Sequence, residues 1–358
     1  LLLSLGLIMV LSASSPTSLS ETGDDSYVYF KKQATFAVIG VAAMLFISKI
    51  DYRFWKKFYK IAYIASIILL LMVLIPGIGR SAGGARRWIN LGIQFQPSEL
   101  AKIGLIIFYA SYLTDHKDEL KDFKKGFVKP LLYLIPVVLI LILVQDHLSA
   151  TIIIVLVVGI MMLMAGVRPK YFATVGTGVA VAGAAGLYAM AKFTSKGAFR
   201  IARITSFLNP WADKQGDGWQ VIQSLYAIGS GGLFGVGLGQ SKQKYLYISE
   251  PHTDFIFAVL AEELGFVGCA IVIGLFGIFI WRGVLAAMKA PDMFGSLVAV
   301  GITSLIGLQA IINIAVVTSS MPVTGMPLPF FSYGVTSLLI LLCSVGVLLN
   351  ISRAGTKV

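Results

Sequence analysis

Long apolar segments recur along the chain, and shorter polar segments separate them. Apolar segments of about twenty residues are typical of transmembrane helices, because a bilayer core is about 30 Å thick. The segments fall at about 1–13, 34–50, 61–78, 99–113, 130–145, 148–165, 171–191, 253–281, 294–317 and 334–352. This pattern predicts an all-α polytopic membrane protein with about ten transmembrane helices, in a single transmembrane domain over residues 1–358.

Composition supports a membrane protein and excludes several functional classes. The chain is 57% hydrophobic and 13% charged, and its mean hydropathy is +0.85, which no soluble domain of this size approaches. In a membrane protein, the net charge of +12 is explained first by basic cytoplasmic loops and only second by an anionic ligand. A nucleic-acid partner is excluded, because no basic run is interleaved with exposed aromatic residues. The cysteines and histidines lack metal-ligand spacing.

The basic residues of the short loops predict the orientation of the chain. Most of them lie in alternate loops, around 49–60, 117–129, 168–170, 282–289 and 353–357. The positive-inside rule then places both termini in the cytoplasm. The loop between the seventh and eighth helices, about 192–253, is extracytoplasmic. We expect a short amphipathic helix at Gln220–Ile228 and a flexible glycine-rich backbone at Gly229–Gly239.

The segment Pro251–Gly265 carries the strongest candidate for chemistry. Thr253 to Trp281 would form a helix about 43 Å long, so Asp254 is expected at the outer membrane surface while the same helix spans. An acid at this depth indicates function, but an aspartate at a helix start also serves as an N-cap. Glu262 and Glu263 are expected about two turns further in.

Two other outer connections carry polar candidates. The third-to-fourth connection holds Arg86, Arg87 and Trp88, and the fourth span begins with Glu99 and Lys102 on one helix face. An ion pair and an aromatic anchor explain part of this group, whereas an outer anionic ligand would also explain the two arginines. The last outer loop, 318–334, has three prolines that predict irregular backbone. Residues 12–20 read as an ordinary solvated loop.

The motifs GARRWI, FQPSELAK, SFLNPWAD, GLGQSKQK, PHTDFIFAVLAEELGF and VTGMPLPFFSYG stand in the chain in this order. With them the sequence resembles the SEDS family (shape, elongation, division and sporulation) from its first span to its last. It is closer to the FtsW and SpoVE branches than to the RodA branch. Two departures stand out: the turn at 146–151 lacks the family's proline and glycine, and Val335 replaces a glycine.

The resemblance implies a peptidoglycan glycosyltransferase of the bacterial cytoplasmic membrane. It would polymerise glycan strands from lipid II at the outer face, beside a class B penicillin-binding protein, in cell division or sporulation. The implied catalytic acid is Asp254. The implied substrate-binding residues are Arg86, Arg87, Trp88, Glu99, Lys102, Arg200, Arg203, Lys242 and Ser332. A divalent cation, Mg²⁺ or Mn²⁺, is implied by the family alone.

The reaction would join two sugars while a polyprenyl diphosphate leaves. It needs a base, cationic groups for the diphosphate and a dry groove. The alternatives are a lipid II flippase and a non-catalytic scaffold for the penicillin-binding protein. For contact with that partner's single span we expect the lipid-facing sides of the eighth and ninth helices. The small residues Gly295, Ser296 and Gly301 would permit close helix approach there.

Overall fold

The structure, a computed structural model, is mostly helical. It describes residues 1–82, 85–90, 92, 94–178, 207–212, 214, 216, 218–245, 247–248 and 250–356. The principal helices in that part of the chain are α1 (Leu2–Thr22), α2 (Val28–Ile47), α3 (Arg53–Lys56), α4 (Tyr59–Leu71), α5 (Pro97–Asp115), α6 (Lys129–Leu139), α7 (Leu148–Ala165), α10 (Trp219–Gly231), α11 (Ile256–Met288), α12 (Met293–Val317) and α13 (Val335–Gly355).

Seven helices in the described ranges are long and apolar enough to cross a membrane. They confirm a multi-pass helical protein, although the expected count of about ten spans is not confirmed. The third expected span corresponds to the shorter apolar helix Tyr59–Leu74, and the fourth corresponds to α5. The seventh expected span, 171–191, lies mostly outside the described residues, as do Arg200 and Arg203.

The chain divides into two compact units, and each is assembled from segments far apart in sequence. Unit 1 contains Leu1–Thr35, Ala173–Gly277 and Gln309–Gly334. Unit 2 contains Phe36–Phe172, Ile278–Leu308 and Val335–Val358. Because α11 and α12 each contribute residues to both units, the polar motifs at their two ends belong to different units.

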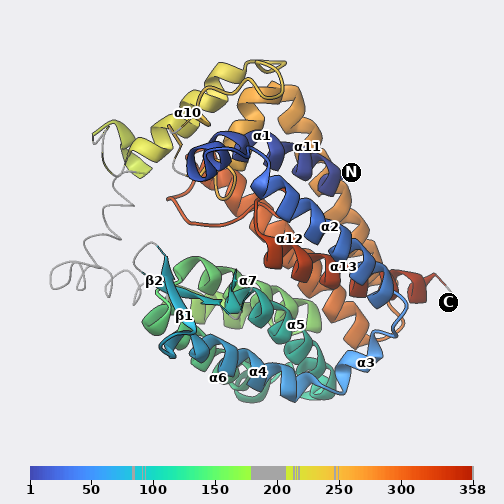
Figure 1. The fold of residues 1–358 in the computed structure, drawn as a ribbon. Helices are drawn as coiled ribbons and strands as arrows, with labels where there is room; N and C mark the ends of the chain where they lie inside the picture. The colour runs from blue at the N-terminus through green and yellow to red at the C-terminus, as the bar shows by residue number, and fades with distance from the viewer. Residues whose placement is uncertain are drawn as a thin grey trace. The chain divides into compact units, whose positions relative to one another are not determined.

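Unit 2 contains a helical layer and a small sheet. In it, α5 packs beside α4 and α7 (Figure 1). The sheet has the antiparallel order β1 (Gly79–Ala82), β2 (Ala85–Asn90), β3 (Gln94–Phe95), and its last strand leads into the start of α5. No strand was predicted for this connection from the sequence. A hairpin forms instead, because pairing satisfies backbone groups that helices cannot satisfy in so short a segment.

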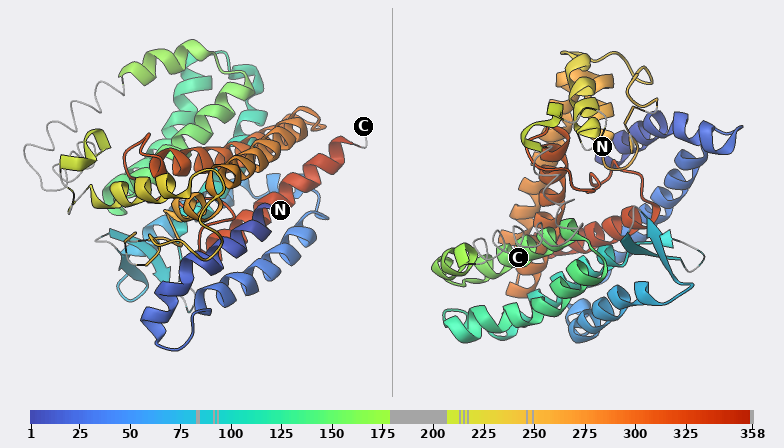
Figure 2. Two further views of the ribbon diagram at one scale, coloured as in Figure 1. Left: turned by 90° about the horizontal axis from the view of Figure 1, so that it is seen from above. Right: turned by 90° about the vertical axis from the view of Figure 1, so that its left-hand side faces the viewer.

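Unit 1 contains helix α10 and the first part of α11, which lie side by side (Figure 2). The expected amphipathic helix at Gln220–Ile228 is confirmed as α10. The expected continuous helix over 253–281 is wrong, because α11 is broken at Gly265, where φ is 65° and ψ is −167°. The part after the break, residues 266–288, is about 34 Å long as a helix, enough to cross a bilayer core of about 30 Å.

The break brings a second segment of unit 1 against α11. Val236 and Gly237 donate backbone hydrogen bonds to the carbonyls of Glu262 and Glu263, and Phe266 donates to the carbonyl of Gly232. These bonds replace helical bonds that the break removes. The stretch Gly229–Gly239, expected to be flexible, is therefore bonded in place. Its glycines permit close approach: a Cβ at Gly235 would overlap the backbone of Glu263.

The first helix also differs from its expected end. Residues 12–20 were expected to form a solvated loop, but α1 continues to Thr22. Ser14 and Ser18 are buried on this helix, and the Ser12 hydroxyl donates to the Glu263 carboxylate at 2.6 Å. Hydropathy alone assigns serines to water, whereas hydrogen bonds from Ser12 to Glu263 and from Ser18 to the carbonyl of Asp25 let these two lie inside a helical layer.

Candidate active site

Asp254 lies just before α11, in unit 1, and is half-buried. Its backbone carbonyl accepts a hydrogen bond of 2.8 Å from the Asn313 side chain of α12. The same amide donates to the carbonyl of Met326 at 2.6 Å. A Cβ added to Gly325 would lie 3.0 Å from Asp254 Oδ2, so the carboxylate lies against the glycine backbone of the loop 318–334. The Asn313 hydrogen bonds fix the backbone at Asp254 relative to the loop 318–334.

The loop 318–334 is bonded directly to the residues around Asp254. The Ser332 hydroxyl donates to the carbonyl of Thr253 at 2.6 Å and accepts from the backbone N–H of Leu328 at 2.7 Å. The backbone N–H of Tyr333 donates to the carbonyl of His252 at 2.8 Å. The Ser332 side chain is buried, and both hydrogen bonds of its hydroxyl are made to backbone groups of this chain. This geometry favours support of the Asp254 backbone as the role of Ser332.

His252 forms an aromatic group with two tyrosines next to Asp254. Its ring centroid lies 4.9 Å from that of Tyr29 and 5.7 Å from that of Tyr333. Burial lowers the pKa of His252 below its ordinary value, and the carboxylates Glu250 and Glu21 oppose that shift in part. The imidazole is therefore neutral at neutral pH.

Unit 2 carries the arginines of the sheet. On β2, neighbouring side chains point to opposite faces. Arg86 is exposed, whereas Arg87 is half-buried and donates to the backbone carbonyls of Gln145 and Asp146 at 3.2 and 2.7 Å. Asp146 has a left-handed backbone with φ of 48°. Arg87 thus stabilises the turn that precedes α7, where the chain departs from the family pattern. Trp88 is half-buried beside it.

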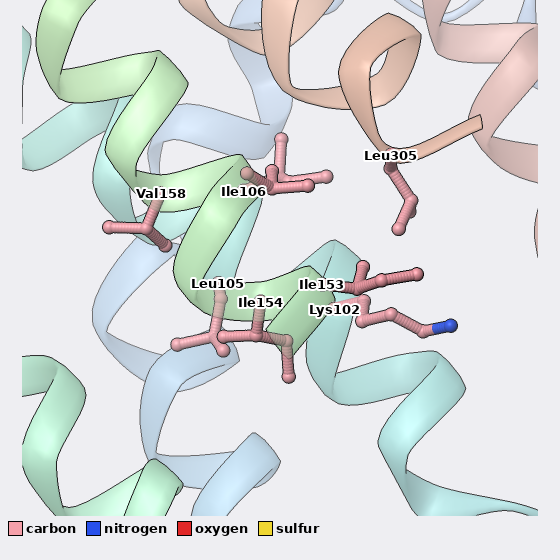
Figure 3. Close-up of a pocket in the computed structure, with 8 residues that line it drawn as sticks. Lys102, Leu105, Ile106, Ile153, Ile154, Val158 and Leu305 are labelled. Atoms are coloured by element: carbon pink, nitrogen blue, oxygen red, sulfur yellow. The ribbon is translucent and has the colours of Figure 1, made fainter. Parts of the chain in front are cut away.

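Glu99 and Lys102 form the expected ion pair at the start of α5. Their oxygen and nitrogen lie 2.7 Å apart, and the Lys102 side chain is only 4% exposed. The Lys102 stem also lines a cavity otherwise bounded by aliphatic side chains of α5, α7 and α12 (Figure 3). The cavity holds about 10 Å³, close to the room one water needs. It is too small for a lipid chain unless the helices separate.

His147 joins these groups. It is buried and lies before the first residue of α7. Burial, followed by the positive charges of Arg87 and Lys102, lowers the pKa of His147 to about 3. Arg87 of β2 donates to the carbonyls of Gln145 and Asp146, and the side chain of Gln96, the residue before α5, lies 3.5 Å from His147 Nδ1. The strand β2, the start of α5 and the turn at 145–147 therefore converge in unit 2.

The predicted site residues fall into separate groups. Asp254, Ser332 and Lys242 belong to unit 1, and Lys242 is exposed. The remaining described candidates belong to unit 2: Arg86, Arg87, Trp88, Glu99 and Lys102. Sequence analysis missed Asn313, Gly325 and His147. A polar residue within the apolar run of α12 was the available signal for Asn313. The family departure at the 146–151 turn was the signal for His147.

The backbone at Val335 does not need the conformational freedom of the glycine that stands at this position in the family pattern. It is the first residue of α13, and its φ is not positive. A β-branched residue is therefore tolerated at this position without backbone strain.

The long apolar helices define a polytopic membrane protein in which one of these helices, α11, is broken at Gly265. The family model for FtsW, RodA and SpoVE, described as "Cell cycle protein", matches residues 1–357. The chain belongs to this family.

Curated relatives span nearly the whole chain. Stage V sporulation protein E of Bacillus subtilis (strain 168) is 47% identical over 354 residues, covering 99% of this chain and 94% of its own length. A probable peptidoglycan glycosyltransferase FtsW of Geobacter sp. (strain M18) is 43% identical over 348 residues, covering 97% and 92%.

Solved structures share the fold. A chain from a structure titled "Structural coordination of polymerization and crosslinking by a peptidoglycan synthase complex" aligns with a TM-score of 0.79 at 29% identity, over 98% of this chain and 97% of that one. The rod shape determining protein RodA of Thermus thermophilus aligns with a TM-score of 0.65 at 29% identity, over 97% and 94%. The fold of this chain is therefore RodA-like.

Proposed function

We propose that this chain polymerises peptidoglycan glycan strands from lipid II at the outer face of the bacterial cytoplasmic membrane. The proposal rests on the family, on relatives named as probable peptidoglycan glycosyltransferases and on the likeness to a chain of a peptidoglycan synthase complex. The observation that carries it is the half-buried Asp254, whose neighbouring backbone is fixed by Asn313 and Ser332.

Asp254 is suited to act as a general base. An acceptor hydroxyl attacks the anomeric carbon of the second sugar, the bond from that carbon to the diphosphate oxygen breaks, and the Asp254 carboxylate takes the hydroxyl proton. A single base opposite the leaving group inverts the anomeric carbon. Gly325 permits the close approach of this carboxylate, because a side chain there would begin only 3.0 Å from Asp254 Oδ2.

The leaving diphosphate needs cations. Arg86 and Lys242 are the exposed candidates in the described chain, and arginine can bind phosphate oxygens in a bidentate manner. Arg87 and Lys102 are already engaged by backbone carbonyls and by Glu99. We therefore assign them to holding the turn before α7 and the start of α5 within unit 2. Arg200 and Arg203 remain predictions outside the described residues, and Trp88 is proposed as an interfacial contact for the substrate.

A divalent cation is implied by the family, and it would need side chains that can bind a metal ion. Within the described ranges, no group of three or more His, Cys, Asp or Glu side chains could hold a metal ion. Because Mg²⁺ is often held by one or two carboxylates together with substrate phosphates, a divalent cation, Mg²⁺ or Mn²⁺, stays a proposal from the family. No step of the proposed reaction is routed through it.

The test is glycan polymerisation by Asp254→Asn protein. Purified wild-type and variant proteins are incubated with lipid II and a class B penicillin-binding protein, and polymer is resolved by length. Asn keeps the size and capping ability of Asp but cannot accept the proton, so activity should fall at least about a hundredfold. Asp25→Asn, which alters an exposed acid paired with Lys31, is the matched control and should polymerise normally.

The opposite result separates the alternatives. Folded Asp254→Asn protein that polymerises lipid II near the wild-type rate would remove the base from the proposal. Wild-type protein that makes no polymer, but moves lipid II across vesicles, would point to the flippase. Wild-type protein that does neither, yet stimulates the penicillin-binding protein, would point to the scaffold.

The proposed partner is a class B penicillin-binding protein that contacts the chain within the membrane. Two of the three small residues expected to support this contact pack inside the chain instead: Gly295 and Gly301 are buried, and a Cβ at either would overlap Tyr52 or Ile106 of the same unit. The exposed apolar side chains Ile271, Ile278 and Trp281 of α11 remain the candidate surface. Photo-crosslinkers at Ile271 and Ile278 should capture the partner in cells, and its absence from both would refute this surface.

A further inference from the structure

Glu262 and Glu263 lie at the far end of the short helical segment that begins after Asp254. The axial distance from Ile256 to Glu262 is about 9 Å. The segment is buried along this whole length, and both glutamates are buried too, at 2% and 0% exposure. Buried carboxylates are costly unless hydrogen-bonded or paired with a cation. Their partners therefore show what they do.

Glu262 binds the backbone of the outer loop. Its carboxylate accepts from the Ser241 hydroxyl at 2.5 Å, from the N–H of Lys242 at 2.9 Å and from the N–H of Gln243 at 3.3 Å. Three donors fix the carboxylate and the turn together, since hydrogen bonds to a charged acceptor are strong and directional. The side chain of Lys242 is exposed while its backbone is held.

Glu263 and Lys244 complete the clamp with an ion pair. Their atoms lie 3.0 Å apart, and the side chains are 0% and 3% exposed. The Lys244 ammonium also donates to the Ser12 hydroxyl at 3.0 Å and to the carbonyl of Gly239 at 2.8 Å. An ammonium has three hydrogens, and these contacts account for all three. Lys244 is thus a structural cation, unlike Lys242.

Three segments of unit 1 meet at this ion pair: the middle of α1, the turn at 239–244 and the first part of α11. Backbone hydrogen bonds and close glycine contacts also join residues 232–237 to α11 around Gly265. The loop is therefore held at the end of the first part of α11 by these contacts as well. The loop that presents Lys242 is therefore joined rigidly to the helix whose other end follows Asp254. Supporting contacts of this kind hold reacting groups in productive geometry.

We propose that Glu262, Glu263 and Lys244 are positioning residues, which hold the outer loop so that Lys242 meets the departing diphosphate while Asp254 takes the proton. This inference rests on the proposed function and adds a device that couples the two groups. The clamp touches no substrate. It acts through the backbone of Ser241–Gln243 and through the short helix of α11.

The first test measures the loop itself, independently of activity. Hydrogen exchange of the amides in 239–245 is followed in purified full-length protein, for wild type and for Glu263→Gln. The variant leaves Lys244 buried without its counter-charge, so exchange should accelerate by about tenfold or more. Lys31→Met, which breaks the exposed pair with Asp25, is the matched control. Unchanged exchange in Glu263→Gln would overturn the clamp.

The second test asks whether the clamp acts through Lys242. Lys242→Ala is made in wild type and in Ser241→Ala, a mild variant that removes one donor to Glu262 and keeps the ion pair. In wild type, Lys242→Ala should lower kcat/KM by about tenfold or more, the scale of a charged hydrogen bond. In Ser241→Ala the same change should cost much less. Equal, multiplicative losses would overturn the coupling, and so would a silent Lys242→Ala.

A rescue variant separates charge balance from packing. Glu263→Gln combined with Lys244→Met removes both charges, so no unpaired buried charge remains. This double variant should recover part of the polymerisation lost in Glu263→Gln. A double variant worse than either single one would contradict the ion pair's role. A wild-type protein that makes no glycan would refute the proposed function, and the exchange measurement would still decide whether the clamp holds the loop.

Discussion

At the scale of single residues, the polar side chains of the site serve the backbone as much as they serve chemistry. Arg87, Asn313 and Ser332 each donate to backbone carbonyls. An unsatisfied buried carbonyl costs free energy, so these residues make irregular backbone possible beside the candidate groups. Sequence analysis identified Arg87 and Ser332 but expected ligand contacts for them. Residue type predicts hydrogen-bonding capacity, whereas only the fold decides which partner lies within reach.

His147 leads to a prediction about pH. Its pKa falls from an ordinary 6.5 to about 3 in the folded chain, so between these values the unfolded chain binds the proton and the native chain does not. Stability therefore decreases as pH falls through this range. At pH 5 the native state should be destabilised by about 2 kcal/mol relative to pH 7.5 through this group.

Unfolding temperatures in detergent measure this effect. His147→Asn cannot bind the proton, so its loss of stability between pH 7.5 and pH 5 should be smaller than that of wild type. Identical pH profiles for wild type and His147→Asn would show that the imidazole is accessible to protons in the folded protein.

At the scale of elements, the break in α11 divides one apolar run into two helices with different surroundings. The first, up to the glutamates, is buried, whereas the second exposes Phe266, Ile271 and Trp281. Exposed apolar side chains at this spacing are typical of a lipid-facing helix. Hydropathy averages over both parts, so it predicts the run and misses the break.

Gly265 should be the residue on which this break depends. Its φ is 65°, and a Cβ there would lie 2.7 Å from the carbonyl of Leu233. Gly265→Ala should therefore destabilise the protein by at least about 2 kcal/mol, through backbone strain and overlap together. A lower unfolding temperature and faster exchange at 232–237 would measure it.

Gly274→Ala provides the control within the same helix. A Cβ at Gly274 meets nothing within 4 Å, and alanine favours helix over glycine by about 1 kcal/mol. This variant should be as stable as wild type or more stable. If Gly265→Ala matched it, α11 would be continuous in solution.

At the scale of the whole molecule, the basic loops predict orientation. Lysines in the loops around 49–60 and 117–129 should face the cytoplasm, and the outer loop with α10 should face the other side. In a protein with Cys269 and Cys343 replaced by alanine, a cysteine at Lys214 should react with an impermeant thiol reagent in intact cells. A cysteine at Lys124 should react only after the membrane is opened. The reverse labelling pattern would invert the proposed topology.

The sequence by itself determined the helical membrane class, the family and the position of Asp254 ahead of a long apolar helix. These features depend on local hydrophobicity and on motifs read along one chain, so no tertiary information was needed. The tertiary structure decided the small sheet, the length of α1, the break at Gly265 and the clamp of Glu262 and Glu263. The sheet pairs residues that are near in sequence, whereas the break and the clamp depend on partners far away in sequence. A buried serine or carboxylate is stable only when that partner supplies a hydrogen bond or a charge.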